Sequence, residues 1–281
     1  RTVTESLDAL GIEYNLISDL DLNEDRLDRE VVILPYNPKM PQAAAEIVET
    51  YVRGGGNLVS FYTLPIKVAT AVRIRTGRHI PEKKKGNFAS IRAVKDQIYG
   101  LPKSVHQNSW NILHAQPLNR EARVAAWWYN DNGVSTKQPA ILISKDCIYM
   151  THVLLSDNPA ERNRLVLAMI GYFRPEVWKE TAESRMKQIG VFADFTGFEH
   201  TLQELLARAA WNRGVLTAVK DARSARKNID LLFEEKKYIE VIAEAQQTQD
   251  SLIRAYCLTQ ESVKGEFRGW WCHSPYGVDG M

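Results

Sequence analysis

The residues best suited to chemistry in this chain are its cysteines and histidines, and their spacing favours no metal site. The three cysteines, Cys147, Cys257 and Cys272, lie too far apart for a Cys-x-x-Cys motif, so we expect free, buried thiols. The six histidines, at positions 79, 106, 114, 152, 200 and 273, do not have the spacing of zinc ligands. We therefore expect no bound metal and no cofactor.

Adjacent aromatic residues are a second candidate, because exposed rings can stack on sugars. Trp127, Trp128 and Tyr129 lie in a strand-like run, in which neighbouring side chains point to opposite faces. At most alternate rings could form a platform, and Trp128 is expected in the core. The pair Trp270 and Trp271 alternates in the same way.

Charge is concentrated in one stretch, between Lys67 and Lys95, where nine basic residues face Glu82 as the single acidic one. A solvated, mobile loop is favoured here over an anion-binding surface. The formal net charge of +2 gives no case for nucleic acid. No apolar run reaches the 18 residues of a membrane span. We expect neither nucleic acid nor a membrane as partner.

The first half of the chain alternates strand and helix patterns. A helix is predicted over 4–10 and a strand over 12–17. The β-branched run 31–34 predicts a strand buried on both faces. A helix opened by Pro41 follows, with Ala45, Val48 and Val52 on one side, and then a strand at 58–61. This unit favours a parallel crossover and an α/β domain.

The pattern is weaker over 65–120 and becomes clear again afterwards. Strands are predicted at 122–129, 140–143 and 147–150, with a turn at 130–133. Asp157 or Asn158 is expected to cap the next helix. From about Trp178 the leucine and alanine spacing predicts a helical hairpin with one preceding helix. Residues 265–273 then predict a lone strand, which cannot fold by itself.

The tail carries a family likeness. The segment 265–281, GEFRGWWCHSPYGVDGM, resembles the first strand and loop of the (β/α)8 barrel of bacterial family-10-like glycosyl hydrolases. Residues 1–178 resemble the class I glutamine-amidotransferase-like domain that accompanies such enzymes, a relative of the β-galactosidase trimerisation domain. The resemblance implies an α/β, flavodoxin-like fold, with a mostly parallel sheet and helices on both faces, followed by an all-α helical segment.

The resemblance also implies that the amidotransferase triad is lost. Such an enzyme needs a Cys on a strained strand-to-helix turn, activated by a His and a carboxylate. The matching turn begins Phe61-Tyr62 and holds no cysteine. His152 falls in the region of the family's histidine, but Leu154 stands where its Glu partner is expected. Phe61, Tyr62 and His152 are therefore interpreted as a vestigial triad region.

A glycosidase needs two carboxylates at the ends of its barrel strands. With a single barrel strand in this chain, the catalytic pair is expected beyond Met281. His273 and Ser274, at the end of that strand, are candidates for residues on the rim of the sugar site. The implied division is an amidotransferase-like domain at 1–178 that lacks its first strand, a helical connector at 179–262 and a truncated barrel at 263–281.

The sequence leaves two main functions open, and the missing Cys weighs against a third, a surviving hydrolase or amidotransferase with an unrecognised nucleophile. The first is a non-catalytic accessory portion of a glycoside hydrolase, acting in assembly or architecture, with an oligosaccharide or polysaccharide as substrate of the parent enzyme and a homo-oligomer formed through the α/β domain. The alternative is a glycan- or small-ligand-binding module that uses the crevice at the carboxyl ends of the parallel strands. In that case the basic stretch would favour acidic sugars. The resemblance favours a secreted or periplasmic protein.

Overall fold

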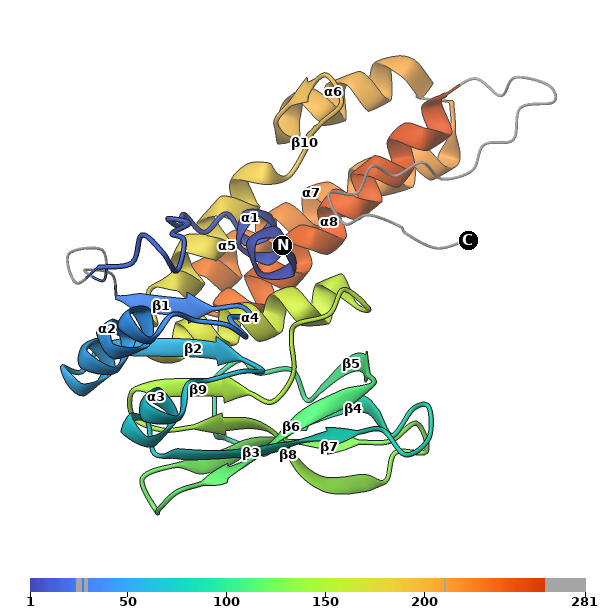
Figure 1. Cartoon of the computed structure of the whole chain (residues 1–281). Coiled ribbons are helices and arrows are strands. Elements are labelled where there is room, and N and C mark those ends of the chain that lie inside the picture. Colours follow the sequence, from blue (N-terminus) through green and yellow to red (C-terminus); the bar gives the residue numbers. More distant parts are fainter. Residues whose placement is uncertain (24–26, 28–29, 210, 261–281) are drawn as a thin grey trace. The chain divides into compact units, whose positions relative to one another are not determined.

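The computed structural model describes residues 1–23, 27, 30–209 and 211–260 (Figure 1). Their contacts divide the chain into two compact units. Of the described residues, the α/β unit holds those within 1–9 and 13–175, and the helical unit holds 10–12, 176–209 and 211–260. The α/β class, followed by an all-α segment, is confirmed.

The α/β unit begins with α1 (Thr2–Leu10) and then forms the predicted strand–helix–strand unit from β1 (Val31–Leu34), α2 (Gln42–Arg53) and β2 (Asn57–Phe61). β1 pairs parallel to β2, so the crossover is confirmed. β9 (Cys147–Met150) pairs parallel to the other side of β2. These three strands therefore end at a common carboxyl edge.

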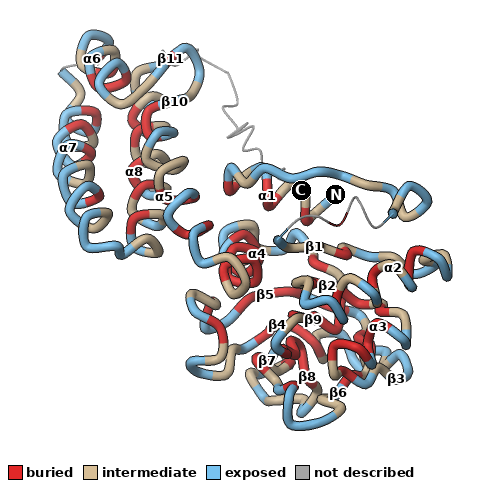
Figure 2. The backbone as a smooth tube through the Cα atoms, turned by 90° about the vertical axis from the view of Figure 1, so that its left-hand side faces the viewer, coloured by how far each residue is buried: buried red, intermediate tan, exposed pale blue. Residues whose placement is uncertain are grey.

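Helices cover both faces of this parallel part. The α2 residues Val48 and Val52, with residues of α3 (Ile66–Ala71), share one core cluster with Leu58 of β2. The alternate β2 residues Val59 and Phe61 are buried outside that cluster. The long helix α4 (Pro159–Phe173) also contributes no residue to it, although nine of its residues are buried (Figure 2).

The remaining strands make the sheet mixed. The seven-stranded order is β1-β2-β9-β8-β7-β4-β5, and every pairing from β9 onward is antiparallel. These strands are β4 (Phe88–Ala93), β5 (Ser104–Ser109), β7 (Arg123–Tyr129) and β8 (Ser135–Ile143). The expectation of a mostly parallel sheet thus holds for the β1, β2 and β9 part. The other strands follow one another through short connections, which suit antiparallel pairing.

The basic stretch is structured, so the prediction of a mobile loop is wrong. β3 (Ile74–Pro81) pairs antiparallel with β6 (Asn111–Pro117) in a separate two-stranded ribbon. The charges of the stretch are also dispersed among separate partners. Lys67 pairs with Glu46, and Arg73 pairs with Glu121. These contacts occupy two of the nine basic residues of the stretch.

Two local predictions near the N-terminus are corrected. Residues 12–17 form no strand. β1 is only partly buried over Val31–Ile33, because it is the edge strand of the sheet rather than a central one. A β-branched run predicts a strand well, but its position within the sheet depends on its pairing partners.

The predicted capping of α4 is confirmed for Asn158, whose side chain accepts a hydrogen bond from the Glu161 N–H. Asp157 has another role: its carboxylate accepts the Asn108 N–H at 2.6 Å. Glu161 accepts the His106 N–H at 2.7 Å. Two outward N–H groups of the edge strand β5 are therefore satisfied by side chains, which protects this edge from pairing with other strands.

The helical unit contains α5 (Val177–Gln188), α6 (Phe198–Ala209), α7 (Arg213–Glu234) and α8 (Tyr238–Thr259), with a small hairpin of β10 (Val191–Phe192) and β11 (Phe195–Thr196). The α7 and α8 helices form the predicted hairpin. Two helices, α5 and α6, precede it rather than the one expected, and both pack on α8. Residues of all four helices share one core cluster. The hairpin of two-residue strands was missed, because such short strands leave no periodic signal.

Candidate functional site

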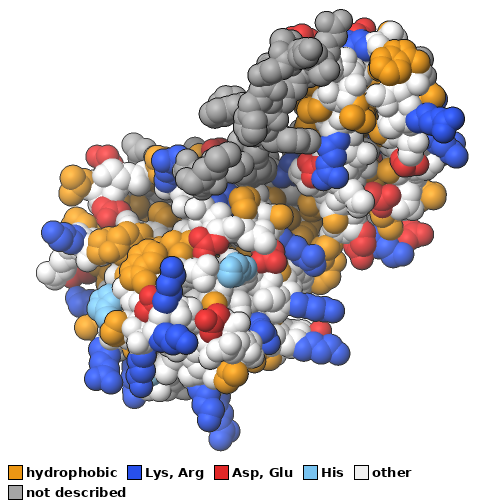
Figure 3. All heavy atoms as spheres, turned by 90° about the vertical axis from the view of Figure 1, so that its right-hand side faces the viewer, with side chains coloured by type: hydrophobic (Ala, Val, Ile, Leu, Met, Phe, Trp, Pro, Cys, Tyr) orange, Lys and Arg blue, Asp and Glu red, His pale blue; other side chains and the backbone are white. Residues whose placement is uncertain are grey.

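Aromatic side chains meet at the carboxyl edge of the parallel strands. Tyr36, Tyr62 and His152 follow β1, β2 and β9 within two residues of each strand's end. His79 of β3 and Trp110, between β5 and β6, join them; we call these five residues the aromatic edge cluster. In Figure 1 the three arrows point to one side, and Figure 3 shows hydrophobic side chains gathered on the face at that side, with histidine nearby. The edge of an open α/β sheet where parallel strands end is the usual place for a ligand site.

Tyr62 occupies a strained strand-to-helix turn between β2 and α3. Its φ of 65° lies in the left-handed region, which costs a side-chain-bearing residue about 1 kcal/mol or more. Its backbone oxygen accepts a hydrogen bond from the buried Tyr149 hydroxyl, which ties the turn to β9. Tyr62, which the resemblance places in a vestigial triad region, therefore has a fixed backbone.

The Tyr62 hydroxyl is fully engaged. It donates to Asn111 Oδ1 at 2.7 Å, and it lies 3.0 Å from His79 Nδ1. Because the hydroxyl has one hydrogen, His79 Nδ1–H must be the donor in the second bond. Burial first, and then the neighbouring Tyr36, raises the pKa of Tyr62, so the phenol stays protonated at neutral pH.

A break in the β3–β6 register lies directly before His79, between Thr76 and His79. Such a bulge turns the following side chain to a new direction. His79 itself is exposed. The irregular strand therefore carries an accessible imidazole whose Nδ1 is held by Tyr62.

His152 lies beneath the cluster and is only 1% exposed. Its Nδ1 lies 3.0 Å from the Val153 carbonyl oxygen and 3.4 Å from Gln107 Nε2. The Gln107 amide already donates to Ser109 Oγ and to the same Val153 oxygen. All groups are satisfied when Nδ1 carries the proton and donates to Val153, which leaves the Nε2 lone pair free. Burial lowers the pKa of His152 to about 4, against smaller opposing effects of Val153 and Asp157, so the ring is neutral at pH 7.

Two rings of the cluster face solvent. Trp110 is 53% exposed and stands edge-on to His152, with ring centroids 4.9 Å apart. Tyr36 is 49% exposed and contacts the Tyr62 ring at 5.7 Å. Tyr62 in turn contacts the His152 ring at 5.3 Å. A continuous series of rings therefore connects two exposed aromatic side chains across a buried, hydrogen-bonded centre.

The cluster does not form a catalytic triad among the described residues. The Tyr62 hydroxyl is bound to Asn111 and His79, and the hydrogen bonds of His152 Nδ1 go to an amide and a carbonyl rather than to a carboxylate. Cys147, at the centre of the sheet, is fully buried, and this burial raises the pKa of its thiol above the usual range. Among the described residues, the cluster therefore offers no activated nucleophile.

Several sequence-predicted residues have other roles. Trp128 is in the core as predicted, and its indole N–H donates to Thr151 Oγ1 at 2.9 Å. Phe61 is a buried strand residue. Cys147 is a buried thiol as predicted, but Cys257 is exposed, because its helix position faces away from the core. Cys272, Trp270, Trp271, His273 and Ser274 lie outside the described residues.

The sequence did not single out Tyr36, His79, Trp110 or Asn111 as site residues. Tyr36 had a usable signal, because it follows a predicted parallel strand within two residues, as Tyr62 does. The other three depend on the β3–β6 ribbon, which the weak pattern of 65–120 did not predict.

The described part of the chain contains no group of three or more His, Cys, Asp or Glu side chains that could hold a metal ion. Within the same residues, no helix has the length and apolar character needed to cross a membrane.

Comparisons with known proteins give a distant structural likeness. No family model and no curated protein matches the chain. A solved structure of a protein described as a GMP synthase subunit, from Thermoplasma acidophilum, is 13% identical, with a TM-score of 0.43, and the match covers 61% of this chain and 88% of that one. A ThuA-like protein from Bacteroides uniformis is also 13% identical, with a TM-score of 0.41, over 62% of this chain and 86% of that one.

Proposed function

We propose that this chain is a non-catalytic accessory region whose α/β unit binds a glycan at the aromatic edge cluster. The observation that carries the proposal is the pair of half-exposed rings, Trp110 and Tyr36, on either side of a fixed polar centre. The parent glycoside hydrolase predicted from the tail stays a prediction, because residues 263–281 lie outside the described part of the chain.

The chemistry of the cluster suits a sugar. The C–H face of a pyranose ring is apolar and packs on an exposed aromatic ring, while its hydroxyls need hydrogen-bond partners. Small-ligand sites combine apolar and aromatic walls with a few well-placed polar groups. Trp110 and Tyr36 offer such walls, and His79 and Asn111 offer polar atoms held in place by Tyr62.

The test is a titration of the whole chain with soluble oligosaccharides built from glucose, galactose, mannose, xylose, N-acetylglucosamine and uronic acids, followed by tryptophan fluorescence and calorimetry. We expect Trp110→Ala to weaken binding by about tenfold or more, as an aromatic anchor does. Its effect on stability should be about 1 kcal/mol or less, because the side chain is half exposed.

Trp211→Ala is the matched control. Trp211 is 81% exposed and belongs to the helical unit, so its loss should leave sugar affinity unchanged. The proposal is overturned if no sugar in the panel binds, or if the two variants bind equally well.

A further inference from the structure

A second hollow lies on the same edge of the α/β unit, in the segment between α1 and β1. We propose that this hollow is a second subsite for the same ligand, and that the ligand is therefore a neutral oligosaccharide rather than a single sugar. This inference rests on the proposed function of the aromatic edge cluster.

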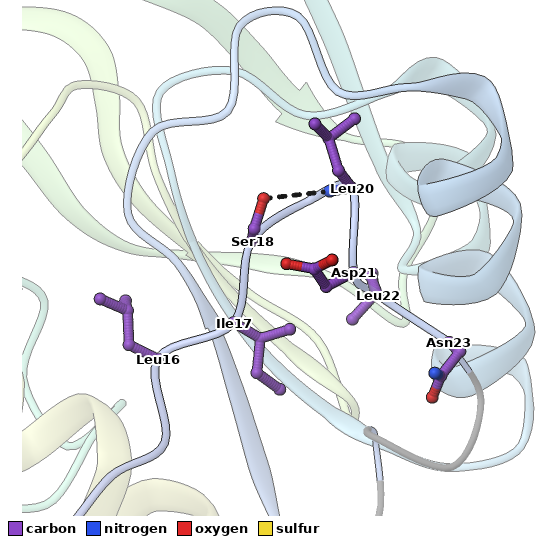
Figure 4. Close-up of a pocket in the computed structure, with 7 residues that line it drawn as sticks. All are labelled: Leu16, Ile17, Ser18, Leu20, Asp21, Leu22 and Asn23. Atoms are coloured by element: carbon purple, nitrogen blue, oxygen red, sulfur yellow. Dashed lines mark hydrogen bonds between the residues drawn. The ribbon is translucent and has the colours of Figure 1, made fainter.

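The hollow is a pocket of about 470 Å³ lined by Leu16, Ile17, Ser18, Leu20, Asp21, Leu22 and Asn23 (Figure 4). Its volume falls in the range of about 300–1,000 Å³ that is common for small-ligand sites. The Leu20 N–H donates to Ser18 Oγ, and the Asp21 N–H donates to the Ser18 carbonyl, so a turn shapes the wall. Leu16 and Leu20 are 81% and 83% exposed, which leaves apolar surface beside the polar side chains.

The pocket is connected to the aromatic edge cluster through two adjacent residues. Asn37 Nδ2 donates to Asp19 Oδ1 at 2.6 Å, which fixes the pocket segment to the end of β1. The preceding residue, Tyr36, contacts the Tyr62 ring. Leu22 of the pocket packs on the same core cluster as Tyr62. In the proposed arrangement, one ligand runs along the edge from the cluster past Tyr36 to the pocket.

The charges at the pocket end of this edge favour a neutral ligand. Asp19 and Asp21 lie at the pocket end. At the other end, the Glu82 backbone N–H donates to the Trp110 carbonyl, but the Glu82 carboxylate accepts the Gly86 N–H within its own turn. Carboxylates accept hydrogen bonds from sugar hydroxyls but repel uronic acid carboxylates. The acidic sugars expected from the basic stretch are thus not what this edge would select.

The experiment compares the methyl glycoside and the tetrasaccharide of the sugar that binds in the panel, together with the matching uronic acid tetrasaccharide. The wild-type chain should bind the neutral tetrasaccharide at least about tenfold more tightly than the monosaccharide, since two linked subsites act together. The double variant Leu20→Ala/Asp21→Ala should lose this advantage and keep its affinity for the monosaccharide. Leu231→Ala, at an exposed leucine of the helical unit, is the control and should change neither affinity.

The outcomes separate the two proposals. Equal wild-type affinities for the monosaccharide and the tetrasaccharide would overturn the second subsite and leave the proposed function standing. Tighter binding of the uronic acid tetrasaccharide would overturn the neutral ligand. If no sugar binds at all, the proposed function fails, and this inference fails with it.

Discussion

The two units each contain an aromatic cluster, and the two clusters are built differently. In the helical unit, Phe192, Phe195 and Tyr256 pack against one another at centroid distances of 5.2–5.8 Å. Arg208 lies over the Phe195 ring at 5.2 Å. No hydrogen bond of the Tyr256 hydroxyl is found among the described residues. This cluster holds the small β10–β11 hairpin against the helices.

In the α/β unit, by contrast, the rings surround fixed polar atoms and two of them face solvent. The Tyr62 hydroxyl accepts from His79 and donates to Asn111. The ring of His152 lies beneath Trp110, with the Nε2 lone pair left free by the proton on Nδ1. Grouped aromatic residues alone thus indicate packing. Grouped aromatic residues with organised polar atoms and exposed faces are the features on which the proposed binding site rests.

The largest loss of stability is expected from a substitution in the helical unit. Phe195→Ala should destabilise this unit by about 3–5 kcal/mol, because the ring is almost fully buried. Hydrogen exchange of peptides from α6 and α8 measures the loss, while sugar affinity should not change. Val191→Ala, at an exposed residue of the same hairpin, is the control. Reduced sugar binding in Phe195→Ala would contradict the division into one packing cluster and one binding cluster.

A pH-dependent loss of stability is expected in the α/β unit cluster. The pKa of His152 is about 4 in the folded chain and about 6.5 when unfolded, so between these values the unfolded chain alone binds the proton. The contribution of His152 to the free energy of unfolding is therefore fully present above about pH 6.5. It falls by on the order of 3 kcal/mol as the pH drops to 4.

Urea unfolding at each pH, read by a short alkaline pulse that labels the buried Cys147 thiol, follows the α/β unit directly. His152→Phe should remove this part of the pH dependence. His200→Gln, at the histidine of the helical cluster, should retain it. If His152→Phe keeps the wild-type slope, the neutral, buried state of His152 is refuted.

The smallest expected change in stability comes from removing the hydroxyl of Tyr62, compared with removing that of Tyr256 in the helical unit. Tyr62→Phe removes the hydrogen bonds to Asn111 and His79, which should cost about 0.5–1.5 kcal/mol, because water can reach His79. Tyr256→Phe should change stability by about 0.5 kcal/mol or less, as expected where no hydrogen bond is lost. Thermal unfolding of both variants gives the comparison. Equal losses of stability in the two variants would show that the hydrogen bonds of Tyr62 do not stabilise the α/β unit cluster.

Local patterns in the sequence determined much of the fold. The β1–α2–β2 crossover, the Asn158 cap and the α7–α8 hairpin depend on residue spacing within single elements and on short connections, which a sequence shows directly. Trp128 as a core residue followed from strand alternation in the same way. Tyr62 and His152 were singled out by a family resemblance, because each follows a recognisable strand.

The tertiary structure alone decided which other residues join them. His79, Trp110 and Asn111 reach the edge through the β3–β6 ribbon, whose pairing spans residues far apart in sequence and whose strands carry an irregular register. Exposure was also decided at this level: Trp128 and Trp110 are the same residue type, yet one is fully buried and the other half exposed. Pairing partners and burial are properties of the assembled sheet, so no spacing rule within one segment can specify them.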